Sequence, residues 1–247
     1  MEGKLVAGGG LKAPNAAPPA AVKIARDPVD LPDPLSSRPR RTVDVELEAV
    51  ELVGKLAPET TYAYWTFNGK VPGPFIRIRV GDTVALPFKK RKTSRMIHSV
   101  DLHAVTGQGA ARSRRRRPSA RPRRSALRRA NPGFYVYDCA TPMVANRITS
   151  GRCGLTLVEP AGDEFSVEKL LAERPEYFVF NGAIGVLTAE HPMKAKVGET
   201  VRIFFGVGGP NATSSFHVIG EIFDRVYDQA GTVVVCTFVT AGEPIPA

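Results

Sequence analysis

Cysteine is scarce in this chain of 247 residues, which has only Cys139, Cys153 and Cys236. Three cysteines cannot all pair within one chain, and none of them stands in a CxxC spacing. This excludes a disulfide framework or a zinc ribbon as the basis of the fold. A role for a single thiol stays open.

Long apolar runs are also absent. No stretch approaches the length of a membrane span, and the first residues lack the continuous apolar segment of an export signal. Residues 1–42 are rich in alanine, proline and glycine, which predicts a flexible leader. As written, the chain has no signal that would export it, so a cytoplasmic location is expected from the residues alone.

Acidic residues do not balance the basic ones, and the excess lies in one place. The formal net charge is +10, and ten arginines between Arg112 and Arg129 account for all of it. That stretch contains no lysine and no aromatic residue. A basic chain suggests a polyanionic partner, but this basicity belongs to one segment and not to a whole face of the fold.

Short segments of alternating apolar and polar residues predict an all-β fold. Residues 42–52, 61–67 and 75–80 have the character of strands, and stretches with glycine and proline separate them. Residues 166–176 form a short helix candidate. This spacing of strands and turns favours an antiparallel β-sandwich.

Two parts of the chain repeat the same motifs in the same order. FNG at 67–69 is followed by VGDTV at 80–84, and FNG at 180–182 is followed by VGETV at 197–201. Each copy then reaches a histidine in a strand-like stretch. The repeat predicts two related β domains in tandem. The second is expected to be incomplete, because fewer residues follow its copy of the motif.

The histidines of the first copy lie where chemistry is expected. His98 and His103 are five residues apart in a predicted strand, which sends their side chains to opposite faces. Asp101 shares the face of His103, so a carboxylate would lie beside whatever His103 binds. Cys139 follows a strand and precedes a loop with proline, as in blue-copper sites, where two imidazoles, a thiolate and a thioether hold copper.

Taken together, these segments resemble the copper-containing nitrite reductases. The resemblance runs from about residue 43 to 240 and implies tandem cupredoxin-like Greek-key β-sandwiches. It also implies a periplasmic homotrimer that takes electrons from a small donor protein and reduces nitrite to nitric oxide with copper. The motifs that carry it are TFNGKVPGP, VGDTV, MIHSVDLHAVTGQG, NPGFYVYDCAT, GLTLVEP, PEYFVFNG, KAKVGETVRIFFGVGGPN and SSFHVIGEIFDRVY.

Carried over position by position, the resemblance implies two copper sites. His98 and Cys139 would be ligands of the type 1 copper, which accepts the electron. His103 would be a ligand of the catalytic type 2 copper, with Asp101 and His217 as the acid–base pair that delivers protons to nitrite. By the same resemblance, His217 would act across a subunit interface. A thiolate-bound copper suits electron transfer, whereas an imidazole-bound copper with an open position can bind an oxyanion.

Other positions of these sites depart from the family. The residue beside the cysteine, a type 2 histidine in the family, is Asp138, which can ligate only through oxygen. The two remaining type 1 positions hold Arg147 and Arg152. Arginine has no lone pair to donate and is always charged, so it would repel copper. The third type 2 histidine of the family falls beyond Ala247.

These losses imply nitrite reduction that is impaired or absent in this chain, because metal affinity falls steeply with each missing ligand. Without copper, His98 would be an ordinary hydrogen-bonded histidine of a β-sandwich. Cys139 would then be a small buried apolar residue. Asp101 and His217 would be polar groups without a catalytic role.

The arginine-rich segment has two interpretations. His103 and Cys139 are thirty-six residues apart, about the family spacing, so residues 110–130 replace a strand and are expected to disrupt it. Two compensating frameshifts in GC-rich coding sequence would have this effect. The alternative function is a non-catalytic basic β-sandwich protein whose arginine-rich segment binds nucleic acid.

The sequence thus predicts four parts in order. They are a leader over 1–42, a first cupredoxin-like domain over 43–160, a shortened linker over 161–175 and a truncated second domain over 176–247.

Overall fold

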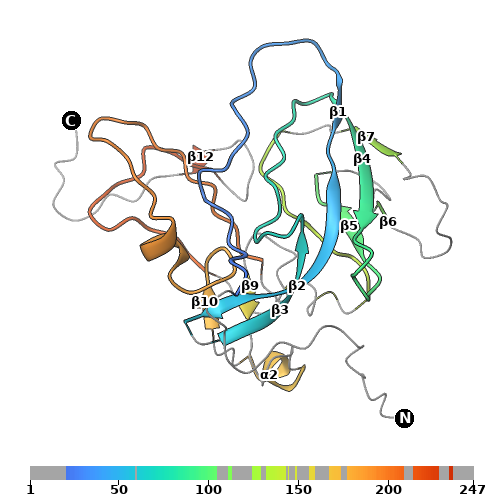
Figure 1. Ribbon diagram of the computed structural model, residues 1–247. Coiled ribbons are helices and arrows are strands. Elements are labelled where there is room, and N and C mark those ends of the chain that lie inside the picture. The colour runs from blue at the N-terminus through green and yellow to red at the C-terminus, as the bar shows by residue number, and fades with distance from the viewer. Residues whose placement is uncertain are drawn as a thin grey trace.

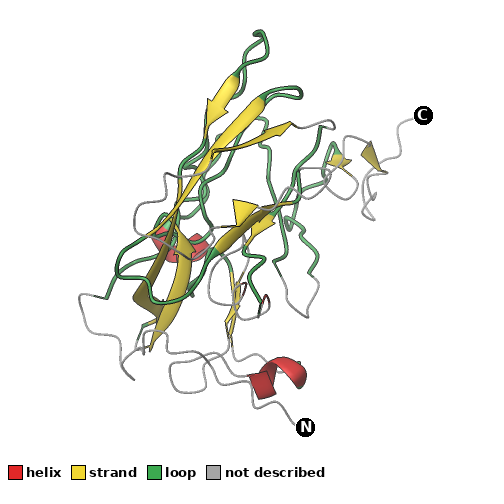
Figure 2. Ribbon diagram, turned by 90° about the vertical axis from the view of Figure 1, so that its right-hand side faces the viewer, coloured by secondary structure: helices red, strands yellow, loops and turns green. Residues whose placement is uncertain are grey.

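Strands and loops make up nearly all of the described chain (Figures 1 and 2), which confirms the all-β prediction. The computed structural model describes residues 21–58, 60–104, 111–112, 124–128, 132–142, 144, 148, 156–158, 167–173, 177–208, 214–227 and 234–235. Within these residues, the helical elements are α2 (Val167–Leu171) and a π-helical turn, η1 (Val186–Glu190), and Val144 and Ile148 are also helical. No helix in the described ranges is long and apolar enough to cross a membrane.

The largest sheet is built from the first copy of the repeat. β2 (Leu47–Ala57) and β3 (Thr60–Phe67) pair antiparallel, as their β-branched and aromatic residues favour. β4 (Thr83–Lys90) runs parallel to both β1 (Thr42–Asp44) and β2. The strand order is β1-β4-β2-β3, with a fifth strand paired to β4. The strand expected over 61–67 is confirmed, whereas residues 42–52 are divided between β1 and β2, with no strand at 45–46.

A smaller sheet shares its core with the large one. It has the order β6-β5-β8 and consists of β6 (Ala111–Arg112), β5 (Ser99–Leu102) and β8 (Tyr137–Asp138). Side chains from both sheets meet in one buried cluster, and burial of each stabilises the fold by about 1.5–3 kcal/mol. Its members are Leu47, Phe67, Val84, Leu86 and Val100.

The described part of the second copy of the repeat contains little strand. β10 (Tyr177–Val179) pairs with β9 (Thr156–Val158), which lies at the end of the first copy, and β11 (Val226–Tyr227) pairs with β12 (Val234–Val235). Large apolar side chains such as Val197 are fully exposed in its described part. This agrees with the prediction of an incomplete second sandwich.

The two copies nevertheless adopt the same backbone turns. Asn68 and Asn181 both have a left-handed backbone, with φ of 57° and 51°. Asp82 and Glu199 each accept the backbone N–H of the residue three positions earlier, at 2.9 and 2.8 Å. Equal turn chemistry at equal positions supports the internal repeat.

Part of the predicted leader packs against the first copy. Ile24 is 1% exposed, and isolated bridges join Val22 to Gly54 and Ala25 to Val71. A Cβ atom on Gly54 would lie 2.4 Å from Ile24, so the glycine leaves the space that the isoleucine fills. This part of the leader therefore contacts the first copy, and the domain boundary at residue 43 stays a prediction. Residues 1–20 of the leader lie outside the described residues.

The strand expected over 75–80 does not form. These residues have no ladder partner in the described chain. Phe75 packs instead against the rings of Phe134 and Phe204, and Ile78 packs against the core cluster. These side chains are partly buried against rings and the core cluster without a neighbouring strand, so the prediction of a strand was wrong.

The arginine-rich segment retains a strand where disruption was expected. β7 (Arg124–Arg128) pairs antiparallel with β4, with Ala126 opposite Ala85. A ladder is made by backbone groups, which every residue other than proline supplies in full, so the arginines do not prevent it. Residues 113–123 and 129–131 lie outside the described residues. Nucleic-acid binding and the frameshift origin stay predictions.

Candidate metal centre

Two groups of polar side chains lie where β5 and β8 pair. His98 comes just before β5 and Cys139 just after β8, and we call them the His98 pair. Asp101 and Asp138 lie on the two strands and His103 follows β5; these three are the His103 cluster. The consecutive residues Asp138 and Cys139 connect the two groups.

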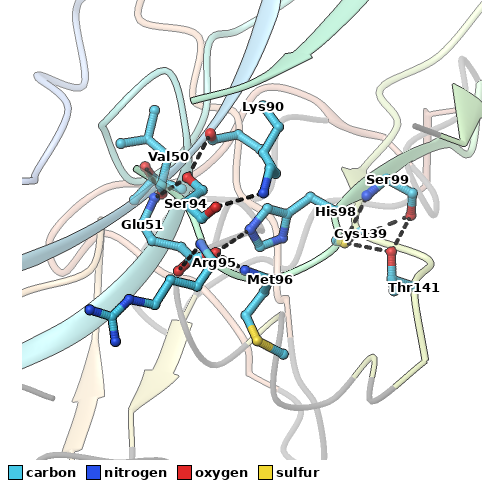
Figure 3. A network of polar contacts seen from close by, with 12 residues as sticks. Val50, Glu51, Lys90, Ser94, Arg95, Met96, His98, Ser99, Cys139 and Thr141 are labelled. Atoms are coloured by element: carbon cyan, nitrogen blue, oxygen red, sulfur yellow. Dashed lines mark hydrogen bonds and ion pairs between the residues drawn. The ribbon is translucent and has the colours of Figure 1, made fainter. Parts of the chain in front are cut away.

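His98 is fully buried and is held by a carboxylate. Its Nε2 atom lies 2.7 Å from Oε1 of Glu51, whose side chain is also fully buried. The same carboxylate accepts the backbone N–H groups of Arg95 and Met96 at 3.0 and 2.7 Å (Figure 3). The ring of Trp65 packs edge-on against the imidazole.

Glu51 is ionised in this environment. Burial alone would raise the pKa of Glu51, but hydrogen bonds from His98 and the two backbone N–H groups outweigh it and lower the pKa to about 2. An ionised carboxylate only accepts hydrogen bonds, so Nε2 of His98 carries the proton that it donates. The Nδ1 atom is then the nitrogen that can offer a lone pair to a metal when the ring is neutral.

Glu51 is a site residue that was not among those predicted from the sequence. It is 47 residues from His98 and belongs to no motif. One signal was present, because Glu51 has the same strand phase as Leu47 and Ala49, which are buried. A carboxylate on the buried face of a strand needs a partner.

Cys139 is buried among hydroxyl groups. Its Sγ atom accepts the backbone N–H of Ser99 at 3.4 Å and lies 3.6 Å from Oγ1 of Thr141. Thr141 in turn donates to the hydroxyl of Ser99 at 2.9 Å. In Figure 3, Glu51 lies on one side of the His98 ring and Cys139 on the other. The fold thus brings the His98 pair together through Ser99, the residue that follows the histidine.

These residues do not fit a complete type 1 copper site. His98 and Cys139 offer one nitrogen and one sulfur, which is half of such a ligand set. The other two positions are Arg147 and Arg152, which lie outside the described residues, and a guanidinium group has no lone pair for a metal. The buried, hydrogen-bonded His98 has the contacts of an ordinary core histidine.

The His103 cluster offers three possible ligand atoms. One from each of Asp101, His103 and Asp138 lies within 4.8 Å of the others. Asp101 and Asp138 stand opposite one another in the antiparallel pair of β5 and β8. The structure therefore places Asp101 beside His103, as the strand alternation predicted. The His103 side chain is 54% exposed, whereas His98 is fully buried.

Asp138 is the most buried member of the cluster. Its residue is 8% exposed, and Oδ1 lies 3.8 Å from Nε2 of His103. Burial raises the pKa of Asp138, His103 opposes this, and the nearby acidic groups of Asp101 and Cys139 raise it further. Asp138 thus places a second carboxyl group beside Asp101, at the position where the resemblance implies a histidine.

His217 lies apart from this cluster. It is exposed, and its ring packs edge-on against Phe223 at 6.2 Å between centroids. Within the described part of the chain, it is not among the groups that could hold a metal with Asp101. Its expected action across a subunit interface stays a prediction.

Comparison with known proteins identifies the relatives of this chain. No family model matches it. The copper-containing nitrite reductase of Neisseria meningitidis serogroup A is 41% identical over 219 residues, which cover 78% of this chain and 57% of that protein. This chain is a relative of the copper-containing nitrite reductases. The copper-containing nitrite reductase of Alcaligenes xylosoxydans is 30% identical over 216 residues, which cover 68% of this chain and 63% of that protein.

A solved structure gives the same answer for the fold. The copper nitrite reductase from Nitrosomonas europaea matches with a TM-score of 0.50 and 25% identity over 61% of each chain. The cupredoxin-like fold of a copper-containing nitrite reductase relative is thereby confirmed. The chain spans just over half the length of the curated relatives it matches.

Proposed function

We propose that this chain is a nitrite reductase relative that reduces nitrite to nitric oxide poorly or not at all. The reaction consumes one electron and two protons per nitrite and releases one water. One observation carries the proposal. Of the four type 1 ligand positions that the resemblance implies, two hold the buried residues His98 and Cys139, and the other two hold arginines. Without a closed thiolate–imidazole copper site, the chain has no efficient place to receive the electron.

The chain keeps part of the acid–base chemistry. Copper in such enzymes supplies the electron when it is bound. The Asp101 carboxyl group lies within the His103 cluster, where its acid form can give a proton to an oxyanion near His103. His217 of a second subunit would complete this pair in a homotrimer, and a small donor protein and a periplasmic location belong to the same proposal.

Optical spectroscopy with a turnover assay tests the proposal. The purified chain is loaded with copper, freed of excess metal and examined for the intense thiolate-to-copper band in the red part of the visible spectrum. Nitrite turnover is measured with a reduced viologen as artificial donor. We expect no such band and no turnover above that of a copper-loaded unrelated protein.

A repaired variant is the matched control. Arg147→His with Arg152→Met restores the nitrogen and thioether positions around His98 and Cys139, so the band should appear in this double variant. A strong band and turnover in the unaltered chain would overturn the proposal.

A further inference from the structure

A cavity lies where residues 23–25 of the predicted leader, the end of β2 and the η1 turn meet, and its volume is about 230 Å³. Ile24 and Leu56 form part of its wall, and both are fully buried members of one core cluster. The backbone N–H of Ile184, another wall residue, donates to the carbonyl oxygen of Leu56 at 2.8 Å. The cavity therefore lies against the packed core, where the two copies of the repeat are joined.

The wall of this cavity is mainly apolar, and small residues give it its room. No atom lies within 4 Å of a Cβ placed on Gly185, and two of the other wall residues are Ala183 and Ala189. Ile184 is 47% exposed although it is large and apolar. Apolar groups lose contact with water when they pack together, so this wall suits the aliphatic part of a small molecule.

Three charged side chains also line the cavity, and they leave an excess of positive charge. The Nζ atom of Lys23 pairs with Oε1 of Glu190 at 3.2 Å, which joins the leader to η1. Lys55 is partly buried, and among the residues that the structure describes it has no acidic partner. A carboxylate beside an ammonium group forms a charge-assisted hydrogen bond. The charge of the site thus complements a ligand with one negative group.

We propose that this cavity binds a short aliphatic carboxylate of about six carbon atoms. Its chain would pack against Ile24, Leu56 and Ile184, and its carboxylate would accept a hydrogen bond from Lys55. The size follows from the volume, because a water molecule takes up roughly 30 Å³ and a methylene group is of similar size. A cavity of about 230 Å³ then holds about eight non-hydrogen atoms, as many as hexanoate has.

The inference goes beyond the proposed function. The cavity shares no residue with the His98 pair or with the His103 cluster, and binding there involves neither copper nor electrons. Its test needs no nitrite. Either proposal can therefore fail while the other stands.

Hexanoate is the ligand for the first experiment. The full chain, labelled with ¹⁵N, is titrated with hexanoate, and the amide signals are followed by NMR. We expect saturable shifts at residues 23–25, 55–56 and 183–190 that fit one site per chain. Butanoate, which is two methylene groups shorter, should bind about tenfold more weakly, because each buried methylene contributes to affinity. Hexylamine has the same chain with a positive charge and should bind at least about fivefold more weakly.

Matched variants assign the binding to this cavity. Lys55→Gln should weaken hexanoate binding by about fivefold, whereas Lys194→Gln, at an exposed position outside the cavity, should leave it unchanged. Ala189→Leu places a larger side chain on the wall and should abolish binding. Circular dichroism shows whether each variant is folded, and Lys55→Gln carries the test if Ala189→Leu does not fold.

Three results would overturn the inference. The first is the absence of saturable shifts at the wall residues. The second is equal affinity for hexanoate and hexylamine, which would show that the positive charge has no part in binding. The third is equal binding of hexanoate by Lys55→Gln and Lys194→Gln, which would place the carboxylate away from Lys55.

Discussion

The Nε2 atom of His98 lies 2.7 Å from Oε1 of Glu51, and both side chains are fully buried. The same carboxylate accepts the backbone N–H groups of Arg95 and Met96, which lead into His98. One carboxylate therefore holds both the imidazole ring and the backbone before it. The orientation of His98 does not depend on a bound metal.

Replacement of Glu51 should destabilise the fold strongly. Glu51→Ala leaves the buried His98 and two partly buried backbone N–H groups without their acceptor, and we expect it to lower the free energy of unfolding by about 3 kcal/mol. Glu51→Gln should cost less, because its amide oxygen can still accept a hydrogen bond. Urea unfolding near neutral pH, followed by tryptophan fluorescence of Trp65, measures both changes.

Glu48 provides the matched control in the same strand. It forms an ion pair with Arg91 at 2.7 Å, and the Arg91 side chain is 48% exposed. Exposed pairs of this kind contribute about 0–1 kcal/mol, so Glu48→Ala should have a small effect. Equal destabilisation by Glu48→Ala and Glu51→Ala would contradict the special role given to Glu51.

The buried Asp82 should make stability depend on pH in acid. Its carboxylate accepts both terminal nitrogens of Arg38, at 2.9 and 2.5 Å, and the backbone N–H of Arg41. The hydrogen bond from Arg38 holds the pKa of Asp82 well below its usual range, although burial opposes this. Because the folded pKa lies below the unfolded one, this stabilisation is present above about pH 4 and is lost as the pH falls further.

Urea midpoints measured between neutral and acid pH check this prediction. The unaltered chain should lose stability as the pH falls below about 4, and part of that loss should be absent in Asp82→Asn, which cannot titrate. Asp33→Asn, at an exposed position, should follow the unaltered chain. A pH dependence that Asp82→Asn leaves unchanged would refute the assignment to Asp82.

Gly182 is where the second copy of the repeat packs against the first. Its φ is +85°, and a Cβ atom there would lie 2.7 Å from Ile24 and 2.9 Å from Val71. Its carbonyl oxygen also accepts the hydroxyl of Tyr64 at 2.7 Å. Gly182→Ala combines backbone strain with a clash, and we expect it to lower the free energy of unfolding by about 3 kcal/mol.

Gly185 separates these two causes. It also has a positive φ, of +77°, but no atom lies within 4 Å of a Cβ placed there. Gly185→Ala should therefore cost only the strain, about 1 kcal/mol. Thermal unfolding of the two variants side by side measures the difference. If both cost the same, the close approach of Ile24 and Val71 has no energetic weight.

Local pattern was enough to predict much of the first copy. Alternation located β2 and β3, and the repeated FNG and VG(D/E)TV motifs adopt equal turns because asparagine and glycine tolerate a positive φ. The same alternation placed Asp101 beside His103, since residues two apart in a strand share a face.

Contacts between distant segments could not be predicted in this way. Ile24 reaches the core because Gly54 leaves space for it, and no local pattern in the leader shows this. Glu51 meets His98 across 47 residues. Residues 75–80 alternate as a strand would, yet a strand also needs a neighbouring backbone, which only the fold supplies.

The last prediction concerns Phe204, which attaches the second copy of the repeat to the first. Its ring lies 5.0 Å from that of Phe75 and 5.4 Å from that of Phe134, between centroids, and it is partly buried. Phe204→Ala removes both ring contacts and should cost about 2 kcal/mol, less than a fully buried phenylalanine. It should also speed proteolysis of the second copy more than that of the first. Phe178 is 66% exposed, so Phe178→Ala should change neither quantity appreciably. Equal effects of the two substitutions would show that the three rings do not hold the copies together.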